Sequence, residues 1–187
     1  SRKGYSVFTV PPTTEIFIRC LENSFRSFGG VPATVVIDNL KAGVIEADLY
    51  DPKLNPKLDD FARHYGTVIL PTRPATPRHK GKVEAGVKYA QNNAIKGRSF
   101  ASLAEQNLHL AQWERTVADT RIHGTIRQQV GKLFETVEKA RLLPLPTSLF
   151  PVFEEAQRSV HRDGHIEFRR AYYSVPPEYA GRQVWVR

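Results

Sequence analysis

The sequence contains no methionine and a single cysteine, Cys20, among its 187 residues. One cysteine excludes an internal disulfide and any metal site built from several cysteines. Long apolar runs are absent too: no stretch approaches the roughly 20 residues that a membrane-spanning helix needs, and the N-terminus has no signal-peptide pattern. We therefore expect a soluble, cytoplasmic protein with no membrane partner. Because the chain begins at Ser1 without a methionine, we interpret it as a fragment.

Acidic residues are fewer than basic ones. The chain has 27 Lys and Arg against 19 Asp and Glu, a net charge of +8 and an isoelectric point near 9.7. Such an excess favours a polyanionic partner, most commonly nucleic acid. No phosphate-binding glycine loop, nucleophilic serine motif or zinc-ligand spacing is found.

The order of the elements in the first 142 residues predicts an α/β fold. Apolar periodicity and capping residues, namely Thr13 or Thr14, Asn55 and Ser102, predict the helices. Continuous β-branched runs predict strands covered on both faces. The expected strands are 5–10, 33–37 and 67–70. The expected helices are one that starts after Thr13 or Thr14 and ends at Gly29-Gly30, then 56–65, 83–97, a segment beginning at 102, and 129–142.

The pattern changes near residue 143. Three prolines between Leu143 and Pro151 predict an interdomain linker. Beyond it apolar residues alternate, and Asp163-Gly164 predicts a hairpin, so we expect a small all-β barrel there. The predicted domains are a catalytic core (1–126), a helical segment with the linker (127–150), and the barrel (151–187).

Two carboxylates are the candidate metal ligands. Asp38 follows the apolar strand 33–37, and ligands of parallel sheets bind beyond the carboxyl ends of strands. Glu84 lies near the start of the next long helix. Carboxylates from separate elements can hold metal ions for phosphoryl transfer. Each also has an ordinary interpretation: Asp38 as a turn cap, and Glu84 as a first-turn acid that pairs with Lys88.

A basic, proline-rich segment separates these two acids. Three prolines predict an irregular, mobile loop over Pro71–Gly81. Its cations could bind DNA phosphates next to the metals, or the loop could simply be solvated. The expected DNA-binding residues are Arg73, Arg78, Lys80, Lys82 and, in a turn between helices, His123.

Several motifs resemble the IstA-like transposases of bacterial insertion sequences. They are Phe28-Gly29-Gly30-Val31-Pro32 leading to Asp38-Asn39-Leu40-Lys41, His64-Tyr65-Gly66, Pro77-Arg78-His79-Lys80-Gly81-Lys82-Val83-Glu84, Arg121-Ile122-His123-Gly124-Thr125 and Tyr173-Ser174-Val175-Pro176. The resemblance covers nearly the whole chain, and the block that ends at Glu84 is quite specific.

The resemblance implies a ribonuclease-H-like integrase core, truncated at its N-terminus, with an Asp, Asp, Glu triad that binds two Mg²⁺ or Mn²⁺ ions. Asp38 matches the second Asp and Glu84 the Glu. The first Asp has no counterpart, because the acids before Asp38 are Glu15 and Glu22, both on a predicted helix, so the chain alone should be inactive. The parent bacterial protein would cleave the 3′ ends of its element and join them to target DNA, as a homo-oligomer assisted by an AAA+ ATPase.

A different class of function is also compatible with the sequence. A DNA-binding or assembly module could keep an integrase-like fold without the chemistry. It would bind DNA without regard to Mg²⁺, with Asp38 and Glu84 far apart or engaged as caps.

Overall fold

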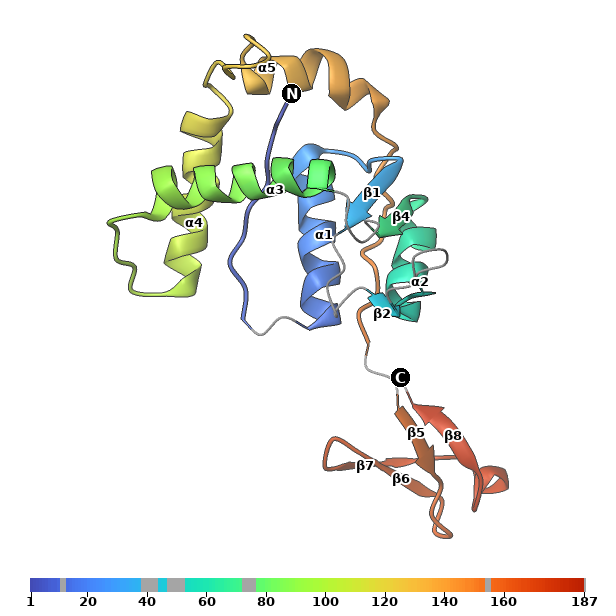
Figure 1. The fold of residues 1–187 in the computed structure, drawn as a ribbon. Coiled ribbons are helices and arrows are strands. Elements are labelled where there is room, and N and C mark those ends of the chain that lie inside the picture. Colours follow the sequence, from blue (N-terminus) through green and yellow to red (C-terminus); the bar gives the residue numbers. More distant parts are fainter. Residues whose placement is uncertain (11–12, 38–43, 47–52, 72–76, 154–155, 187) are drawn as a thin grey trace. The chain divides into compact units, whose positions relative to one another are not determined.

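The computed structural model divides the chain into two compact units, Ser1–Phe150 and Pro151–Arg187 (Figure 1). It describes residues 1–10, 13–37, 44–46, 53–71, 77–153 and 156–186, without the side chains of 44–46, 53–54, 77–80 and 82. Asp38 and Arg73 therefore lie outside the described residues. Within the described residues, no helix is long and apolar enough to cross a membrane.

The first unit mixes helices with short strands, which confirms the predicted α/β class. Its elements are α1 (Thr14–Phe28), β1 (Thr34–Ile37), β2 (Val44–Glu46), β3 (Lys53–Leu54), α2 (Pro56–Tyr65), β4 (Val68–Pro71), α3 (Pro77–Ala90), η1 (Gln91–Ile95), α4 (Leu103–Trp113), η2 (Glu114–Ala118), α5 (Val130–Leu133), η3 (Phe134–Glu138) and η4 (Lys139–Arg141). The turns η1, η2 and η3 are wider π-type turns that continue α3, α4 and α5. The predicted helix 129–142 is thus confirmed as one helical run.

The caps of α1 and α2 are those that the sequence predicts. The side chains of Thr13 and Asn55 accept hydrogen bonds from first-turn N–H groups at 3.3 and 3.0 Å. Both helices end at a glycine with positive φ, Gly29 at 73° and Gly66 at 66°. A residue with a Cβ would be strained in this left-handed conformation, so these glycines fix where each helix stops.

The strands β1 and β4 form a parallel pair, with Thr34 opposite Val68 and Ile37 opposite Pro71. The connection from β1 to β4 contains β2, β3 and helix α2. Parallel strands need such a long crossover connection. The carboxyl ends of both strands consequently lie at the same edge.

Helices α1 and α2 pack through aromatic side chains. Phe25, Phe61 and Tyr65 are buried, with ring centroids 4.7 to 5.8 Å apart. A buried carboxylate, that of Glu22, lies in the same core and is 2% exposed. It accepts hydrogen bonds from the Tyr65 hydroxyl (2.6 Å), the Phe150 N–H (2.8 Å) and the Arg19 guanidinium (2.5 Å).

The proline-rich segment from Leu142 to Phe150, here called the strap, precedes the boundary between the two units and packs against the first unit. Leu143 exchanges two backbone hydrogen bonds with Val31, of 2.7 and 2.9 Å. A Cβ on Gly30 would lie 2.6 Å from the Cβ of Leu142, so only glycine permits this approach. Prolines exclude regular structure but not packing, and the strap belongs to the first unit up to Phe150.

The first ten residues do not form the predicted strand at 5–10. Instead, the side-chain amide of Asn107 on α4 accepts a hydrogen bond from the Phe8 N–H (2.8 Å) and donates one to the Phe8 carbonyl (2.9 Å). Phe8 also packs against the second core, formed by Ala94, Leu110 and Trp113. A strand requires a neighbouring strand, and here one side chain satisfies the backbone groups of Phe8.

The second unit consists of two antiparallel two-stranded sheets and is not the closed barrel that we predicted. β5 (Ala156–Ser159) pairs with β8 (Gln183–Val186), and β6 (His165–Phe168) pairs with β7 (Ala171–Ser174). The Asp163-Gly164 turn forms, but the strands on either side of it pair elsewhere. A short turn, η5 (Pro177–Tyr179), lies between β7 and β8.

Candidate metal and nucleic-acid site

The edge where β1 and β4 end is the structural basis of the candidate site. Ile37 and Pro71 are aligned as the last residues of the two strands. Asp38 follows Ile37 directly in the sequence, and the chain after Pro71 continues through Arg73 to α3. Asp38 and Arg73 themselves are outside the described residues; the strand pairing aligns the last described residues before them, Ile37 and Pro71.

Helix α3 carries Glu84, Arg78, Lys80 and Lys82. The helix begins at Pro77, so Pro77–Gly81 is helical and not part of an irregular loop. Our prediction was wrong here because a proline has no N–H to lose at the first helical position and its φ suits the helix. The basic residues thus lie on a regular element.

Glu84 is the eighth residue of α3 and its side chain is exposed. It does not lie in the first turn, which removes the interpretation of Glu84 as an acid placed to favour the helix dipole. Val83 and Val87, two apolar residues on the same helix, are 68% and 50% exposed. This part of α3 therefore presents its side chains away from the described core.

The C-terminal half of α3 is held by aromatic packing. Tyr89 lies 5.2 Å from Trp113 of α4, and the guanidinium of Arg121 stacks 3.6 Å from the centre of the Tyr89 ring. The Nε atom of Arg121 is buried. Tyr89 is five residues after Glu84, so these contacts fix the direction in which α3 carries the carboxylate. The sequence analysis did not single out Tyr89 or Arg121 for this role.

His123 shapes the turn that follows Arg121. Its backbone N–H donates to the Gln128 carbonyl (3.0 Å), and its carbonyl accepts from the Arg127 N–H (2.7 Å). Its Nδ1 atom lies 3.3 Å from the Thr125 N–H, which donates to it. The ring is half-buried. The described contacts of His123 are thus local ones, and contact with DNA stays a prediction.

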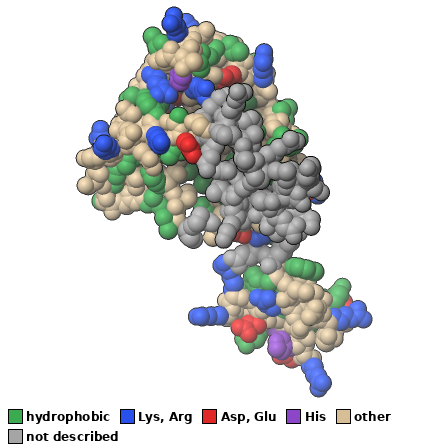
Figure 2. Space-filling view, viewed as in Figure 1, with side chains coloured by type: hydrophobic (Ala, Val, Ile, Leu, Met, Phe, Trp, Pro, Cys, Tyr) green, Lys and Arg blue, Asp and Glu red, His purple; other side chains and the backbone are tan. Residues whose placement is uncertain are grey.

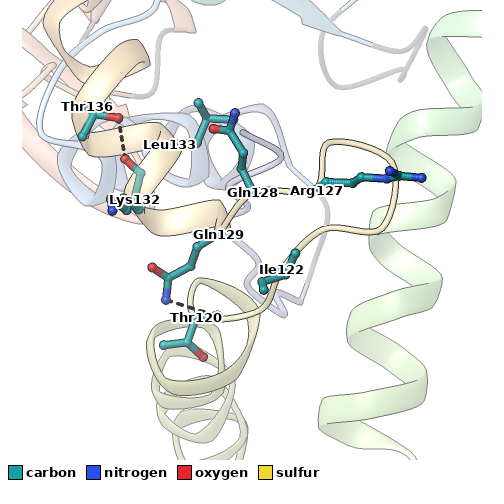
Figure 3. Close-up of a pocket in the computed structure, with 8 residues that line it drawn as sticks. All are labelled: Thr120, Ile122, Arg127, Gln128, Gln129, Lys132, Leu133 and Thr136. Atoms are coloured by element: carbon teal, nitrogen blue, oxygen red, sulfur yellow. Dashed lines mark hydrogen bonds between the residues drawn. The ribbon is translucent and has the colours of Figure 1, made fainter.

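An open cavity of about 550 Å³ lies beside this turn (Figure 3). Hydrogen bonds from Gln129 to the Thr120 carbonyl (3.1 Å) and from Thr136 to the Lys132 carbonyl (2.8 Å) order two of its walls. In Figure 3, Arg127 extends away from the other labelled side chains. The lining residues are Thr120, Ile122, Arg127, Gln128, Gln129, Lys132, Leu133 and Thr136.

His64, from the His64-Tyr65-Gly66 motif, makes packing contacts within the first unit. Its Nε2 atom lies 3.1 Å from the Ser148 carbonyl, and its ring packs edge to face against Tyr65 and Phe150. His64 therefore fastens the strap to α2.

Two acidic residues that precede the His123 turn in the sequence, Asp119 and Glu114, also interact with neighbouring groups. Asp119 pairs with Lys3, and its carbonyl accepts the Gly131 N–H. Burial raises the pKa of Glu114, although a hydrogen bond from Ser6 opposes this effect. Among the described residues, no group of three His, Cys, Asp or Glu side chains is placed to hold a metal ion. The predicted site depends on Asp38, which is not among them.

Basic side chains are spread over the surface. Figure 2 shows Lys and Arg projecting from both units. In the second unit the described cations are five arginines and no lysine: Arg158, Arg162, Arg169, Arg170 and Arg182. Large aromatic side chains are exposed there as well, with Trp185 at 72% and Tyr172 at 69%.

Comparison with known proteins relates the chain to enzymes that move DNA segments. Residues 145–187 match the model of the Mu transposase C-terminal domain. The chain is 36% identical over 169 residues to a protein of Mycobacterium tuberculosis provisionally named a transposase, covering 90% of this chain and 41% of that protein.

Two further relatives belong to named insertion sequences. The transposase for IS21 of Pseudomonas aeruginosa is 34% identical over 99% of this chain, and the one provisionally assigned to IS5376 of Geobacillus stearothermophilus is 32% identical over all of it. The chain spans 48% and 46% of their respective lengths. It is therefore a homologue of bacterial insertion-sequence transposases along nearly its whole length.

Proposed function

We propose that this chain is the part of a transposase that supplies two metal-binding carboxylates, Asp38 and Glu84, for cleaving the 3′ ends of an insertion element and joining them to target DNA. The observation that carries the proposal is the parallel pairing of β1 with β4. That pairing aligns Ile37, the residue before Asp38 in the sequence, with Pro71, the last strand residue before α3, at one sheet edge. The proposed architecture is a ribonuclease-H-like core, in keeping with the insertion-sequence relatives.

The donor set suits Mg²⁺ or Mn²⁺. Carboxylate oxygens are the ligands that these cations prefer, and a site with few protein ligands leaves positions for water and phosphate. Glu84 is exposed on a rigid helix, so its carboxylate is accessible to a hydrated ion and to a large substrate. When bound, two such ions would stabilise the attacking and leaving oxygens of the phosphoryl transfer.

The residues around the carboxylates would hold the DNA. Arg73 lies in the segment before α3, and Arg78, Lys80 and Lys82 lie in its first two turns. Cations there would pair with backbone phosphates and fix the position of the duplex without reading its sequence. Because α3 is held at Tyr89, its N-terminal half would present these cations and Glu84 to one substrate.

The distance between the two carboxylates tests the site directly. In a crystal of this chain soaked with Mn²⁺, we expect the carboxylates of Asp38 and Glu84 within roughly 4 to 8 Å of each other, since paired ions lie about 4 Å apart and metal–oxygen bonds are slightly over 2 Å. A separation well beyond about 10 Å, with both residues ordered, would show that the metal site is wrong. The non-catalytic binding module would then be the better description.

Charge removal on α3 tests the DNA contact. We expect the double change of Lys80 and Lys82 to Gln to weaken duplex binding and to reduce the slope of log K against log salt by about two, because each phosphate contact contributes about 0.9 to that slope. Fluorescence anisotropy at several salt concentrations measures this. A matched control changes Lys139 and Lys57 to Gln, two cations already paired with Glu135 and Glu15. Equal slopes for the test variant and the unaltered chain would argue against phosphate contact by α3.

Two partners complete the proposal. From the resemblance of this chain to IstA-like transposases, we infer a homo-oligomeric assembly on the element ends and an AAA+ ATPase helper. Strand joining with defined DNA ends, with and without the helper, would separate a transposase from a nuclease that only cuts.

A further inference from the structure

The hairpin that joins β6 to β7 has an unusual turn. Phe168 pairs with Ala171, so the turn consists of two residues, Arg169 and Arg170. Their φ angles are +52° and +62°, as in the tight turns that match strand twist. Such turns favour Asn-Gly, because L residues with larger side chains are strained at positive φ. The four described non-glycine residues with positive φ are all arginines: Arg2, Arg127, Arg169 and Arg170.

Arginine at both positions of such a turn costs stability, so the charge of the two side chains is the property to be explained. Both are exposed. The turn places them side by side at the tip of a ribbon, beyond the last paired strand residues. A phosphate contact alone would not require this position, because an arginine on either strand could make one.

The shape of the tip suits the minor groove of duplex DNA. That groove is about 6 Å wide. Two paired strands are about 4.8 Å apart before their side chains are added. Tyr172 is 69% exposed on the flank of the ribbon and widens it further. The ribbon itself is therefore too broad to enter the groove. Guanidinium groups at the tip are narrow enough, and the negative potential of a narrow minor groove attracts them.

A second feature flanks the turn. An open cavity of about 370 Å³ is lined by Arg158, Ser159, His161, Glu167 and Arg169. Arg158 is held in place because its Nε donates to the Glu167 carbonyl at 3.1 Å. This cavity offers cationic and hydroxyl groups for the phosphates that border a groove, with the Glu167 carboxylate as the opposing charge.

We propose that Arg169 and Arg170 form a minor-groove finger that inserts into A·T-rich duplex DNA. The inference rests on the proposed function in one respect, that the partner of this chain is DNA. It assigns the contact to the second unit, separately from the metal site and from α3.

The test replaces the strained pair with the residues that the turn favours. In the 187-residue chain, we expect Arg169→Asn with Arg170→Gly to raise the thermal midpoint of the second unit and yet to weaken binding to an A·T-rich duplex about tenfold or more. The control, Arg162→Gln with Arg182→Gln, removes the same charge from exposed positions of the same unit away from the tip. It should weaken binding less than threefold. A minor-groove ligand such as netropsin should displace the unaltered chain.

Different failures point to different errors. If the Asn-Gly variant binds as tightly as the unaltered chain, or no more weakly than the control variant, the finger is wrong although DNA binding stands. Resistance to netropsin also contradicts the finger. If the unaltered chain binds no duplex at low salt, the proposed function itself is wrong.

Discussion

Replacing Glu22 with alanine is expected to destabilise the first unit by about 3 to 5 kcal/mol, because it leaves buried hydrogen-bond donors without an acceptor. Those donors are the Tyr65 hydroxyl and the Phe150 N–H. The loss also releases the end of the strap. Urea unfolding followed by the helical circular dichroism signal, which arises from the first unit, measures the change.

Glu15→Ala is the matched control. Glu15 lies on the same helix and pairs with Lys57 at 2.5 Å, but that pair is partly exposed. Such ion pairs contribute at most about 1 kcal/mol. If the two alanine variants lose similar stability, the buried carboxylate is not the link between α1, α2 and the strap.

The effect of Glu22 should depend on pH in a defined direction. Burial raises the pKa of Glu22, but hydrogen bonds from Tyr65, the Phe150 N–H and Arg19 outweigh it, and the pKa is lowered overall. A lowered pKa in the folded state means that the contribution is present above the unfolded pKa of about 4.3 and is lost as pH falls through the folded value. The difference between the unaltered chain and Glu22→Ala should therefore shrink in acid.

The stabilisation by the hydrogen bond between the Tyr65 hydroxyl and Glu22 is lost at high pH, where the hydroxyl ionises. Burial and the hydrogen bond to Glu22 raise the pKa of Tyr65 to about 12. Because this pKa lies above the unfolded value of about 10, the contribution is lost as pH rises from about 10 to 12. The Glu22–Tyr65 pair should thus stabilise the unit across the whole neutral range.

Glu84→Gln is expected to abolish DNA cleavage and strand joining by a full-length transposase that contains these residues, by about a thousandfold or more. Several kcal/mol of transition-state stabilisation depend on bound metal, and each 1.36 kcal/mol is a factor of ten in rate. Glutamine keeps the size of the side chain but removes the charge that, in the proposed site, would hold the ion. Gel assays with labelled element ends in Mg²⁺ measure both steps.

DNA binding should survive this change, because the cations of α3 remain. Glu105→Gln is a suitable control: Glu105 is also an exposed helical acid, but its carboxylate accepts the Ala101 N–H at 2.7 Å near the start of α4. Retained cleavage in Glu84→Gln would overturn the assignment of this residue. Loss of binding together with cleavage would instead indicate a structural role.

Local features of the fold follow from the sequence alone. The caps at Thr13, Asn55 and Ser102 and the stop at Gly66 depend on bonds within one or two turns, so short patterns predict them. The parallel pair also follows, because a β-branched run, a helix and a second apolar run admit few other arrangements. Relatedness to transposases was equally visible in the motifs.

Other features depend on contacts between distant segments. Residues 5–10 have the composition of a strand, but their neighbour is a side chain 99 residues away, Asn107. The prolines of the strap predict an irregular path but not its packing against Val31, His64 and Glu22. A capping motif is decided by its own turn. The pairing of β5 with β8, the absence of a closed barrel among the described strands and the burial of Glu22 are decided by which surfaces remain after the rest of the chain has packed.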